Sequence, residues 1–545
     1  MKRRLFIKKT MAALSAPIIL NGIPMNLMAA SLTKMMASSP NDRVVVMIQL
    51  SGGNDGLNMI IPIGQYDSYV DYRENIAIPD SGDRKYIVLD ENMPEEEKLG
   101  LHPDMIGLKA MYDEQMAHIV QNVGYEDMNM SHFRGRDIFF MGGGVNDYYA
   151  SGWMGRYLNE TYPGYPDDYP NDEMLDPLGI EFGYAQSFAF QREEGIPAGL
   201  AIYDPNAFYD LVSGTGVEPP TWLPDTYAGE ELQYLMELEL KSNQYAERIK
   251  FTYDNGINSS SVSYPDVYPY DVPDNYRDNP LSWQLKNVAR LISGGSKTKL
   301  FIVKVERFDT HVEQTLENDT TMGIHASLLY NVNMAVKAFY DDLSEQGLAD
   351  KVFSFTLSEF GRRVNSNDSR GTDHGKAAPM LLFGPMLKPG VSGHAPDLSD
   401  LDDGNLRVEF DYRQVLTSVL KDWLETPDDV IEEVFWSDFI DSRLDLFLSP
   451  NYVQDIAKSK GLNEIDIYPN PAHTFTTLSL NLDRSLEFEI LLFNTSGSML
   501  NRVYHGTKAA GAHEFVVDVS SLPKGMYLLQ VQNNSFSISR KLIVK

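Results

Sequence analysis

The amino-acid sequence predicts an α/β protein with a mainly parallel sheet between helices, followed by a small C-terminal β-sandwich. Between residues 41 and 450, short runs rich in Val, Ile, Leu and Phe alternate with segments of helical periodicity. Continuous apolar runs are typical of strands in a parallel sheet, because helices cover both of its faces. After residue 465, by contrast, strand-like runs follow one another with only turn signals between them.

The strands and the clearest helix of the large region can be placed along the chain. The helix is expected at residues 324–343. Leu328, Val332 and Phe339 are separated by four and seven residues, which places them on one face of a helix. Gly347 stands a few residues beyond it as a stop signal. The expected strands are residues 43–50, 117–123, 299–305, 352–357 and 379–383.

Two stretches of the large region, residues 162–177 and 253–280, break this alternation. Both are rich in Tyr, Pro, Asp and Asn. We interpret them as surface insertions, and two arrangements stay open: aromatic packing orders them, or they form a rim around a site.

The C-terminal part, residues 465–545, is expected to fold by itself. Turn signals such as Thr495-Ser496-Gly497 separate its short β-rich runs, a spacing typical of an antiparallel sandwich. The runs are residues 488–493, 515–519, 526–531 and 536–543. Residues 451–464 are expected to link it to the α/β domain at residues 41–450.

The first 30 residues have the features of an export signal. Basic residues at the start precede an apolar stretch at residues 11–20, which is too short to span a bilayer. Small residues at Ala29 and Ala30 could serve for cleavage. Arg3-Arg4 resembles a twin-arginine export motif, and an ordinary export signal with two arginines is the alternative. Both predict that the mature protein leaves the cytoplasm.

Composition limits the possible partners and ligands. Lys and Arg total 46 against 77 Asp and Glu, which gives a net charge of -31 over 545 residues. Such a chain repels a phosphate backbone, so we expect no nucleic-acid partner. The sequence has no cysteine, so any metal must be held by carboxylates and histidines. We also expect no transmembrane helix in the mature protein.

Polar side chains of the kinds found in metal and catalytic sites lie close to the ends of the expected strands. In open α/β sheets, ligands bind outside the carboxyl ends of the strands. We therefore expect these side chains to share one site. They are Asp55 after the first strand, Ser131, His132 and Arg134 after the second, Asp309 and His311 after the third, Glu359 and Arg362 after the fourth, and Asp373 and His374 before the fifth.

This set predicts a site for a divalent metal, with zinc first and manganese, calcium or magnesium as alternatives. The expected ligands include Asp309 and His311, which point the same way if the backbone is extended. A metal there would polarise a phosphoryl or sulfuryl oxygen. Ser131 could then be the nucleophile, and Arg134 or Arg362 could hold a tetrahedral oxyanion. Ser131, His132, Arg134 and Arg362 form the expected catalytic set, and Asp55, Asp309, His311, Glu359, Asp373 and His374 form the expected metal set.

Each candidate also has a simpler structural interpretation. The glycine-rich segment 52–56 could be only a tight turn, and Ser131 could only cap the helix that follows it. Glu359 and Arg362 could pair with each other. Three further histidines are assigned to core or surface roles: His102, His118 and His325.

The region between Val44 and Leu424 resembles a known family. The motifs are residues 52–58 (GGNDGLN), 101–103 (LHP), 131–133 (SHF), 152–157 (GWMGRY), 309–311 (DTH), 358–362 (SEFGR), 371–375 (GTDHG) and 411–413 (DYR). They resemble the bacterial domain-of-unknown-function family 1501, whose members are exported and sulfatase-like. That family is similar to the alkaline phosphatase superfamily, which implies an alkaline phosphatase/sulfatase-like fold with a divalent-metal ester hydrolase site.

The resemblance also implies roles for individual residues. Asp55 would be a metal ligand on the first strand and Ser131 the nucleophile. Asp309, His311 and His374 would bind one ion, and Glu359 would bind the other. The sequence departs from the superfamily at residues 358–360, where an Asp-His pair is usual.

The C-terminal part resembles the type A sorting domain of type IX secretion cargo. The matching segments are residues 468–471 (YPNP), 522–527 (LPKGMY) and 540–545 (RKLIVK). The resemblance implies the type IX secretion machinery as a partner, with periplasmic transit followed by a cell-surface or extracellular location. A carbohydrate-binding or adhesive sandwich is the alternative.

Together these observations support two main hypotheses. In the first, the chain is an exported metal-dependent hydrolase that acts on phosphate or sulfate esters of a small molecule or a polymer. In the second, it is a surface-displayed binding or assembly protein that keeps the hydrolase fold without turnover. A partner subunit of another exported protein is a third possibility.

Overall fold

The computed structural model describes residues 41–193, 195–213, 243–437, 439–448, 462–494, 499–533 and 536–545, with two short strands before them, β1 (Ile19–Leu20) and β2 (Ile23–Pro24). The chain forms two compact units, Met1–Phe447 and Leu448–Lys545. Apart from β1 and β2, the expected export signal lies outside the described residues, as does most of the expected linker. Within the described part of the chain, no helix is long and apolar enough to cross a membrane.

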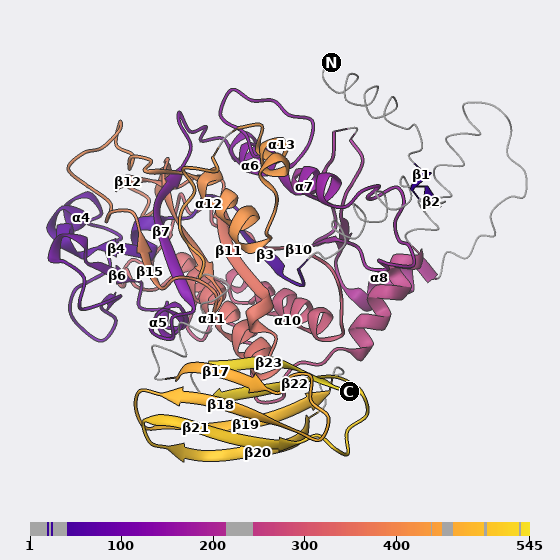
Figure 1. Ribbon diagram of the computed structural model, residues 1–545. Helices are drawn as coiled ribbons and strands as arrows, with labels where there is room; N and C mark the ends of the chain where they lie inside the picture. The colour runs from indigo at the N-terminus through magenta and orange to yellow at the C-terminus, as the bar shows by residue number, and fades with distance from the viewer. Residues whose placement is uncertain are drawn as a thin grey trace, which may run out of the picture. The chain divides into compact units, whose positions relative to one another are not determined.

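The larger unit is built on a nine-stranded sheet in the order β15-β7-β14-β11-β3-β10-β8-β9, with β16 paired to β7 (Figure 1). Its central strands β11, β3, β10, β8 and β9 are parallel to one another, whereas β14 is antiparallel to both neighbours. The strands are β3 (Val44–Leu50), β7 (Ala117–Gly124), β8 (Gly179–Phe182), β9 (Leu200–Ile202), β10 (Leu300–Val305), β11 (Val352–Ser358), β14 (Ala378–Phe383), β15 (Gly390–Ser392) and β16 (Phe410–Asp411). The predicted mixed α/β fold with a mostly parallel sheet is confirmed.

Helices cover both faces of this sheet, which explains why β3 is buried at every position. Val46 and Ile48 pack into one core with α5 (Ile106–Asp113), α10 (Pro280–Ser293) and α11 (Ile324–Glu345). Val45 and Met47 pack into a second core with α6 (His132–Met141), α7 (Trp153–Thr161), α12 (Tyr412–Ser418) and α13 (Asp428–Phe435). Burial of each such side chain contributes about 1.5–3 kcal/mol, so both layers hold the strand in place.

Smaller elements connect these layers. Asp411 begins α12 with a capping box, in which its side chain accepts from the Arg413 backbone while the Gln414 side chain accepts from the Asp411 backbone. The remaining helices are α3 (Gly56–Met59), α4 (Tyr66–Tyr72), α8 (Pro205–Ser213), the π-helix η6 (Val419–Trp423) and the 3-10 turns η1 (Ile63–Gln65), η2 (Glu95–Glu97), η3 (Phe188–Phe190), η4 (Asp274–Tyr276) and η5 (Ala349–Lys351). The remaining strands are β4 (Ile60–Pro62), β5 (Ile87–Val88), β6 (Leu99–Leu101), β12 (Arg362–Ser366) and β13 (Thr372–His374).

The two tyrosine-rich insertions are not confined to the surface, which corrects one expectation. Tyr165 and Tyr268 are buried. The Tyr268 hydroxyl donates a 2.7 Å hydrogen bond to Asp104 Oδ2, and its ring contacts Tyr270 and Tyr330. Aromatic packing therefore orders these segments. This was one of the two arrangements that the sequence left open.

The smaller unit is a sandwich of two antiparallel sheets. One has the order β17-β18-β21 and the other β20-β19-β22-β23. Alternate residues of β18 and β19, such as Leu478, Leu480, Ile490 and Leu492, fill the core between them. The strands are β17 (Leu462–Tyr468), β18 (Phe475–Leu482), β19 (Leu486–Asn494), β20 (Met499–Lys508), β21 (Gly511–Asp518), β22 (Gly525–Asn533) and β23 (Phe536–Val544). The predicted antiparallel sandwich is confirmed.

Candidate functional site

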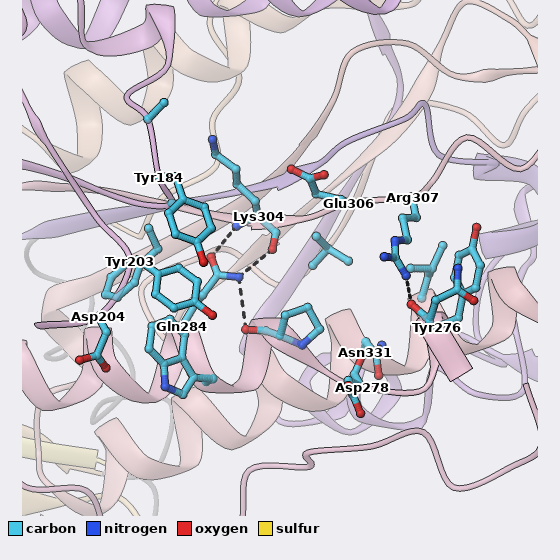
Figure 2. Close-up of a pocket in the computed structure, with 18 of the residues that line it drawn as sticks. Tyr184, Tyr203, Asp204, Tyr276, Asp278, Gln284, Lys304, Glu306, Arg307 and Asn331 are labelled. Atoms are coloured by element: carbon cyan, nitrogen blue, oxygen red, sulfur yellow. Dashed lines mark hydrogen bonds between the residues drawn. The ribbon is translucent and has the colours of Figure 1, made fainter. Parts of the chain in front are cut away.

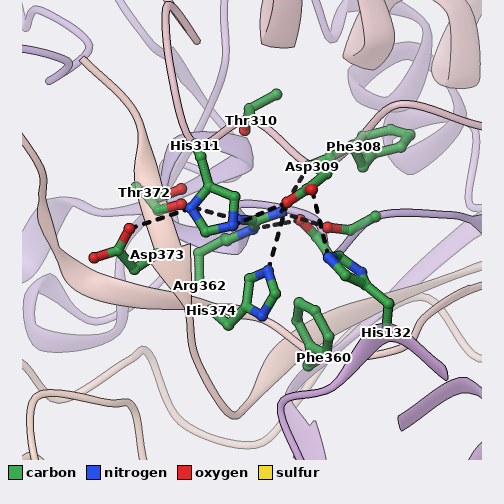
Figure 3. A network of polar contacts seen from close by, with 12 residues as sticks. His132, Phe308, Asp309, Thr310, His311, Phe360, Arg362, Thr372, Asp373 and His374 are labelled. Carbon is green, nitrogen blue, oxygen red and sulfur yellow. Dashed lines mark hydrogen bonds and ion pairs between the residues drawn. The ribbon is translucent and has the colours of Figure 1, made fainter. Parts of the chain in front are cut away.

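Three side chains from distant parts of the chain meet beside the carboxyl ends of the central strands (Figure 3). His132 begins α6, Asp309 follows β10, and His374 ends β13. Each offers one ligand atom, and these atoms lie within 4.8 Å of one another. We call these three residues the His–Asp–His cluster.

Glu359 and Phe360, which follow β11, support His132. The His132 Nδ1 atom lies 3.1 Å from Glu359 Oε1, and its Nε2 atom lies 3.4 Å from Asp309 Oδ2. The Phe360 ring packs against both histidines of the cluster, with centroid distances of 4.9 Å to His132 and 4.4 Å to His374. Carboxylate and ring contacts thus orient the imidazole of His132 from two sides.

The glycine-rich turn after β3 lets two loops approach each other closely. Gly52 has a φ of +125°, and a Cβ at this position would lie 2.3 Å from the Asp309 backbone nitrogen. The Gly52 N–H donates a 2.7 Å hydrogen bond to Glu359 Oε1. Only glycine fits here, so the tight-turn interpretation of residues 52–56 accounts for this segment.

Arg362 fixes the Asp309 carboxylate. Its side chain is fully buried, and its NH2 atom donates to Asp309 Oδ1 at 2.8 Å. Burial acts to raise the pKa of Asp309, but the hydrogen bond and charge of Arg362 outweigh it and lower the pKa. The carboxylate therefore stays ionised and available to a cation.

Hydrogen bonding determines which His374 nitrogen faces the cluster. Its Nδ1 atom lies 2.7 Å from the carbonyl oxygen of Met130, which can only accept, so Nδ1 carries a proton. Burial lowers the pKa of His374, which favours a neutral ring with its lone pair on Nε2. That Nε2 atom lies 3.5 Å from Asp309 Oδ1. Two acceptors facing each other repel unless a cation or a proton lies between them.

The donor set fits a divalent metal. His374 Nε2 and Glu359 Oε2 are buried and have no hydrogen-bond partner among the residues that the structure describes. Buried polar atoms normally have partners, so His374 Nε2 in the cluster is free to bind a ligand. Two imidazoles and a carboxylate are ligands typical of zinc.

His311 and Asp373 extend this network outward. His311 Nε2 lies 3.1 Å from Asp309 Oδ1, and its Nδ1 lies 3.2 Å from Asp373 Oδ1. The Asp373 side chain is 59% exposed. The expected pairing of Asp309 with His311 is therefore present, whereas the Asp373 side chain contacts His311 and, among the described residues, none of the three cluster side chains.

Asp55 is held by another partner set. Its side chain is fully buried, and Oδ2 accepts hydrogen bonds from Arg73 at 2.6 Å and from Gln314 at 2.7 Å. Burial acts to raise the pKa of Asp55, but opposing influences outweigh it and the pKa is lowered. The largest of these influences is the charge of Arg73. Asp55 is not among the His–Asp–His cluster, and its Oδ2 atom pairs with the buried Arg73 guanidinium instead.

Both candidate oxyanion arginines make hydrogen bonds within the protein, and their role toward an oxyanion stays a prediction. Arg362 donates to the carbonyl oxygens of Gly53, Gly52, Phe308 and Thr372 as well as to Asp309. Arg134 donates to the carbonyl oxygens of Val145 and Asp147, and its guanidinium lies over the Tyr148 ring. All three nitrogens of the Arg362 guanidinium therefore have partners, whereas only the NH2 atom of Arg134 donates to carbonyl oxygens in the described contacts.

Ser131 is exposed and directly precedes His132 at the N-cap position of α6. Its side chain makes no capping hydrogen bond, and its backbone N–H donates to Asn129 Oδ1. The capping interpretation therefore does not account for this serine.

Several supporting groups escaped the sequence-based interpretation. The Met130 carbonyl and the buried Arg73 carry no motif of their own, and their partners are distant in sequence. Phe360 lies within the motif at residues 358–362, between two polar residues of interest. The position of Phe360 beside candidate ligands was the one feature of the sequence that could have indicated its role.

Comparisons with known proteins bear on two parts of the chain. Residues 289–435 match the family described as protein of unknown function (DUF1501). Residues 466–545 match the secretion system C-terminal sorting domain. Both resemblances are confirmed. The sorting domain indicates export toward the cell surface or the extracellular space. Among curated proteins, no match is found.

Solved structures with distant similarity include members of one superfamily. A protein in the alkaline phosphatase superfamily from Vibrio parahaemolyticus is 10% identical, with 88% of this chain and 91% of that chain covered and a TM-score of 0.29. The phosphonate monoester hydrolase from Silicibacter pomeroyi is 10% identical, with 92% and 89% covered and a TM-score of 0.29. Alkaline phosphatase from the Antarctic bacterium TAB5 is 9% identical, with 65% and 95% covered and a TM-score of 0.24. Similarity at this level says nothing about activity.

Two buried histidines behind the turn at Gly52 predict a loss of stability in acid. Burial lowers the pKa of His325 to about 4, although Asp55 acts in the opposite direction. Burial also lowers the pKa of His102. The unfolded chain has an ordinary histidine pKa of about 6.5, so below that pH it binds protons that the folded protein does not. The free energy of unfolding should therefore fall as pH drops from about 6.5 toward 4, by about 3 kcal/mol for His325.

Urea unfolding of wild type and of His325→Gln at pH 7, 6 and 5 checks this expectation. The variant should show a shallower decline of unfolding free energy with falling pH. An identical slope in both proteins would contradict it.

Proposed function

We propose that the chain is an exported metal-dependent hydrolase of phosphate or sulfate esters. The observation that carries this proposal is the His–Asp–His cluster, in which the buried His374 Nε2 atom has no hydrogen-bond partner among the described residues. An unpartnered acceptor next to an ionised carboxylate favours a cation over a neutral ligand.

In this proposal His132, Asp309 and His374 hold the ion, while Glu359 and His311 orient them. Bound there, a divalent ion supplies Lewis acidity toward a phosphoryl or sulfuryl oxygen. Arg362 is a positioning residue, because its hydrogen bonds join Asp309 to the turn at Gly52.

Ser131 is the proposed nucleophile. It lies next to His132 in the chain, its hydroxyl has no capping role, and it is exposed. Attack of its oxygen on phosphorus or sulfur would form a covalent ester and release the alcohol of the substrate. Hydrolysis of that ester would then regenerate the serine.

The location follows from both ends of the chain. We propose that residues 1–30 direct export across the inner membrane and that the sorting domain then engages the type IX secretion machinery. The mature protein would pass through the periplasm and act at the cell surface or outside the cell.

An assay with aryl phosphate and aryl sulfate esters tests the proposal. Treatment with a chelator should abolish hydrolysis, and one of zinc, manganese, calcium or magnesium should restore it. Ser131→Ala should lower kcat at least about 100-fold, because the activated nucleophile is lost. Hydrolysis that survives complete chelation would contradict the proposal.

One observation favours the alternative of a binding or assembly protein without turnover. Arg362 donates from all three of its nitrogens to backbone carbonyls and Asp309, and Arg134 donates from one nitrogen to two backbone carbonyls. This alternative predicts a metal-loaded protein that hydrolyses neither ester class and whose properties do not change in Ser131→Ala.

A further inference from the structure

A large cavity lies beside the carboxyl ends of β8, β9 and β10, and no motif or comparison assigns it a role (Figure 2). Its volume is about 1040 Å³. Most pockets for single small molecules measure roughly 300–1,000 Å³, so this one has room for an extended ligand. The strand ends supply Phe182 and Lys304, and the insertion at residues 253–280 supplies Tyr276 and Asp278.

Exposed aromatic rings form a column along one wall. Tyr184 and Tyr203 are stacked at a centroid distance of 4.5 Å and an angle of 11°. Trp283 of α10 continues the column at 5.6 Å from Tyr203. The exposed fraction is 86% for Tyr184, 53% for Tyr203 and 37% for Trp283. Such a set of solvent-facing aromatic rings in a concave site is typical of ligand binding.

The charged groups of the cavity restrict the ligand. The carboxylates that line it are the exposed Asp278 and Glu306 and the half-buried Asp204. Lys304 pairs with the buried Glu181 at 2.5 Å, which leaves Arg307 as the lining cation not held by a carboxylate in the described part of the chain. Because negative charge dominates, an anionic ligand is disfavoured here. Carboxylates instead accept hydrogen bonds well from neutral hydroxyl groups.

We propose that this cavity binds neutral sugar units of a polysaccharide. The C–H faces of a sugar ring pack against Tyr184, Tyr203 or Trp283, and its hydroxyls donate to the surrounding carboxylates. A sugar ring has an apolar face and a polar edge, which match the aromatic rings and the carboxylates of the cavity. The volume favours an oligomer over one monosaccharide.

The position of the cavity relative to the His–Asp–His cluster adds a second consequence. Glu306 and Arg307 line the cavity, and Asp309 of the cluster lies two residues beyond Arg307. Three backbone steps, from Glu306 to Asp309, span at most about 11 Å, a distance that a few sugar units can cover. An esterified sugar at the cluster would then be the substrate, a step that rests on the proposed function.

Isothermal titration calorimetry on the mature protein tests the binding step. The probes are neutral hexasaccharides of glucose, mannose, galactose and N-acetylglucosamine. We expect one of them to bind, and Tyr184→Ala and Tyr203→Ala each to weaken binding about tenfold or more. Tyr148→Ala is the matched control, because Tyr148 is 82% exposed and lies outside this cavity over Arg134. It should bind like wild type.

Failure of the two proposals can be told apart. Glycan binding should persist in His374→Ala, which the proposed function expects to be inactive. Binding without ester hydrolysis in wild type would overturn the hydrolase and keep the glycan cavity. Absence of binding to all four probes, equal binding by wild type and both tyrosine variants, or binding of a lysine-rich peptide in place of glycans would overturn the cavity proposal.

Discussion

Asp309→Asn should remove bound metal and lower ester hydrolysis more than about 100-fold. Loss of an outer partner of a metal ligand costs about 10–100-fold, and loss of a direct ligand should cost more. Asp309 contacts both other cluster residues, with His132 at 3.4 Å and His374 at 3.5 Å, and it also pairs with Arg362. The amide keeps the shape of the side chain but removes the only negative charge of the cluster.

The measurements are metal content per chain and kcat/KM on an aryl ester. Asp309→Asn also leaves the buried guanidinium of Arg362 unpaired, so the variant could lose stability as well. His374→Ala keeps that ion pair and separates the two effects. Asp373→Asn is the matched control, since the exposed Asp373 side chain contacts His311 and Asn367 and, in the described part of the chain, no cluster side chain. Full metal content in both Asp309→Asn and His374→Ala would contradict the assignment.

Arg73→Met should lower the free energy of unfolding by about 3–5 kcal/mol. Arg73 and Asp55 are both fully buried and lie 2.6 Å apart, so removal of the cation leaves a buried carboxylate without its counter-charge. The guanidinium also donates to the carbonyl oxygens of Arg363 and Val364. Those bonds join α4 to the strand that begins at Arg362.

Urea unfolding at pH 7 measures this loss. The double variant Asp55→Asn with Arg73→Met should recover part of the stability, because no unpaired charge remains. Arg407→Met is the control, since its ion pair with Asp400 is exposed, and its urea midpoint should stay at the wild-type value. A double variant no more stable than Arg73→Met would contradict the buried-charge explanation.

Much of the fold could be predicted because the strands at the centre of the sheet are buried on both faces. Residues 43–50 and 299–305 are continuous apolar runs, and β3 and β10 begin one residue inside them. The short strands β8 and β9 were missed, since runs of only four and three residues carry no clear period. β15 and β16 were missed for the same reason.

The candidate site was predictable only where strand ends imply a location. Because β10 is parallel to β3, the expected strand ends placed Asp309 close to the turn at Gly52. No sequence pattern relates Arg73 to Asp55, however, so the buried ion pair between them could not be predicted. The same holds for Arg362, whose carbonyl partners come from three separate segments.

Anomalous X-ray scattering from crystals of the mature protein tests the metal assignment most directly. The account predicts one strong peak about 2 Å from His132, His374 and Asp309, the length of a direct metal–ligand bond. An absorption-edge scan on the same crystals would identify the element. Crystals grown with added zinc, manganese or calcium that show no peak among these three side chains would contradict the account.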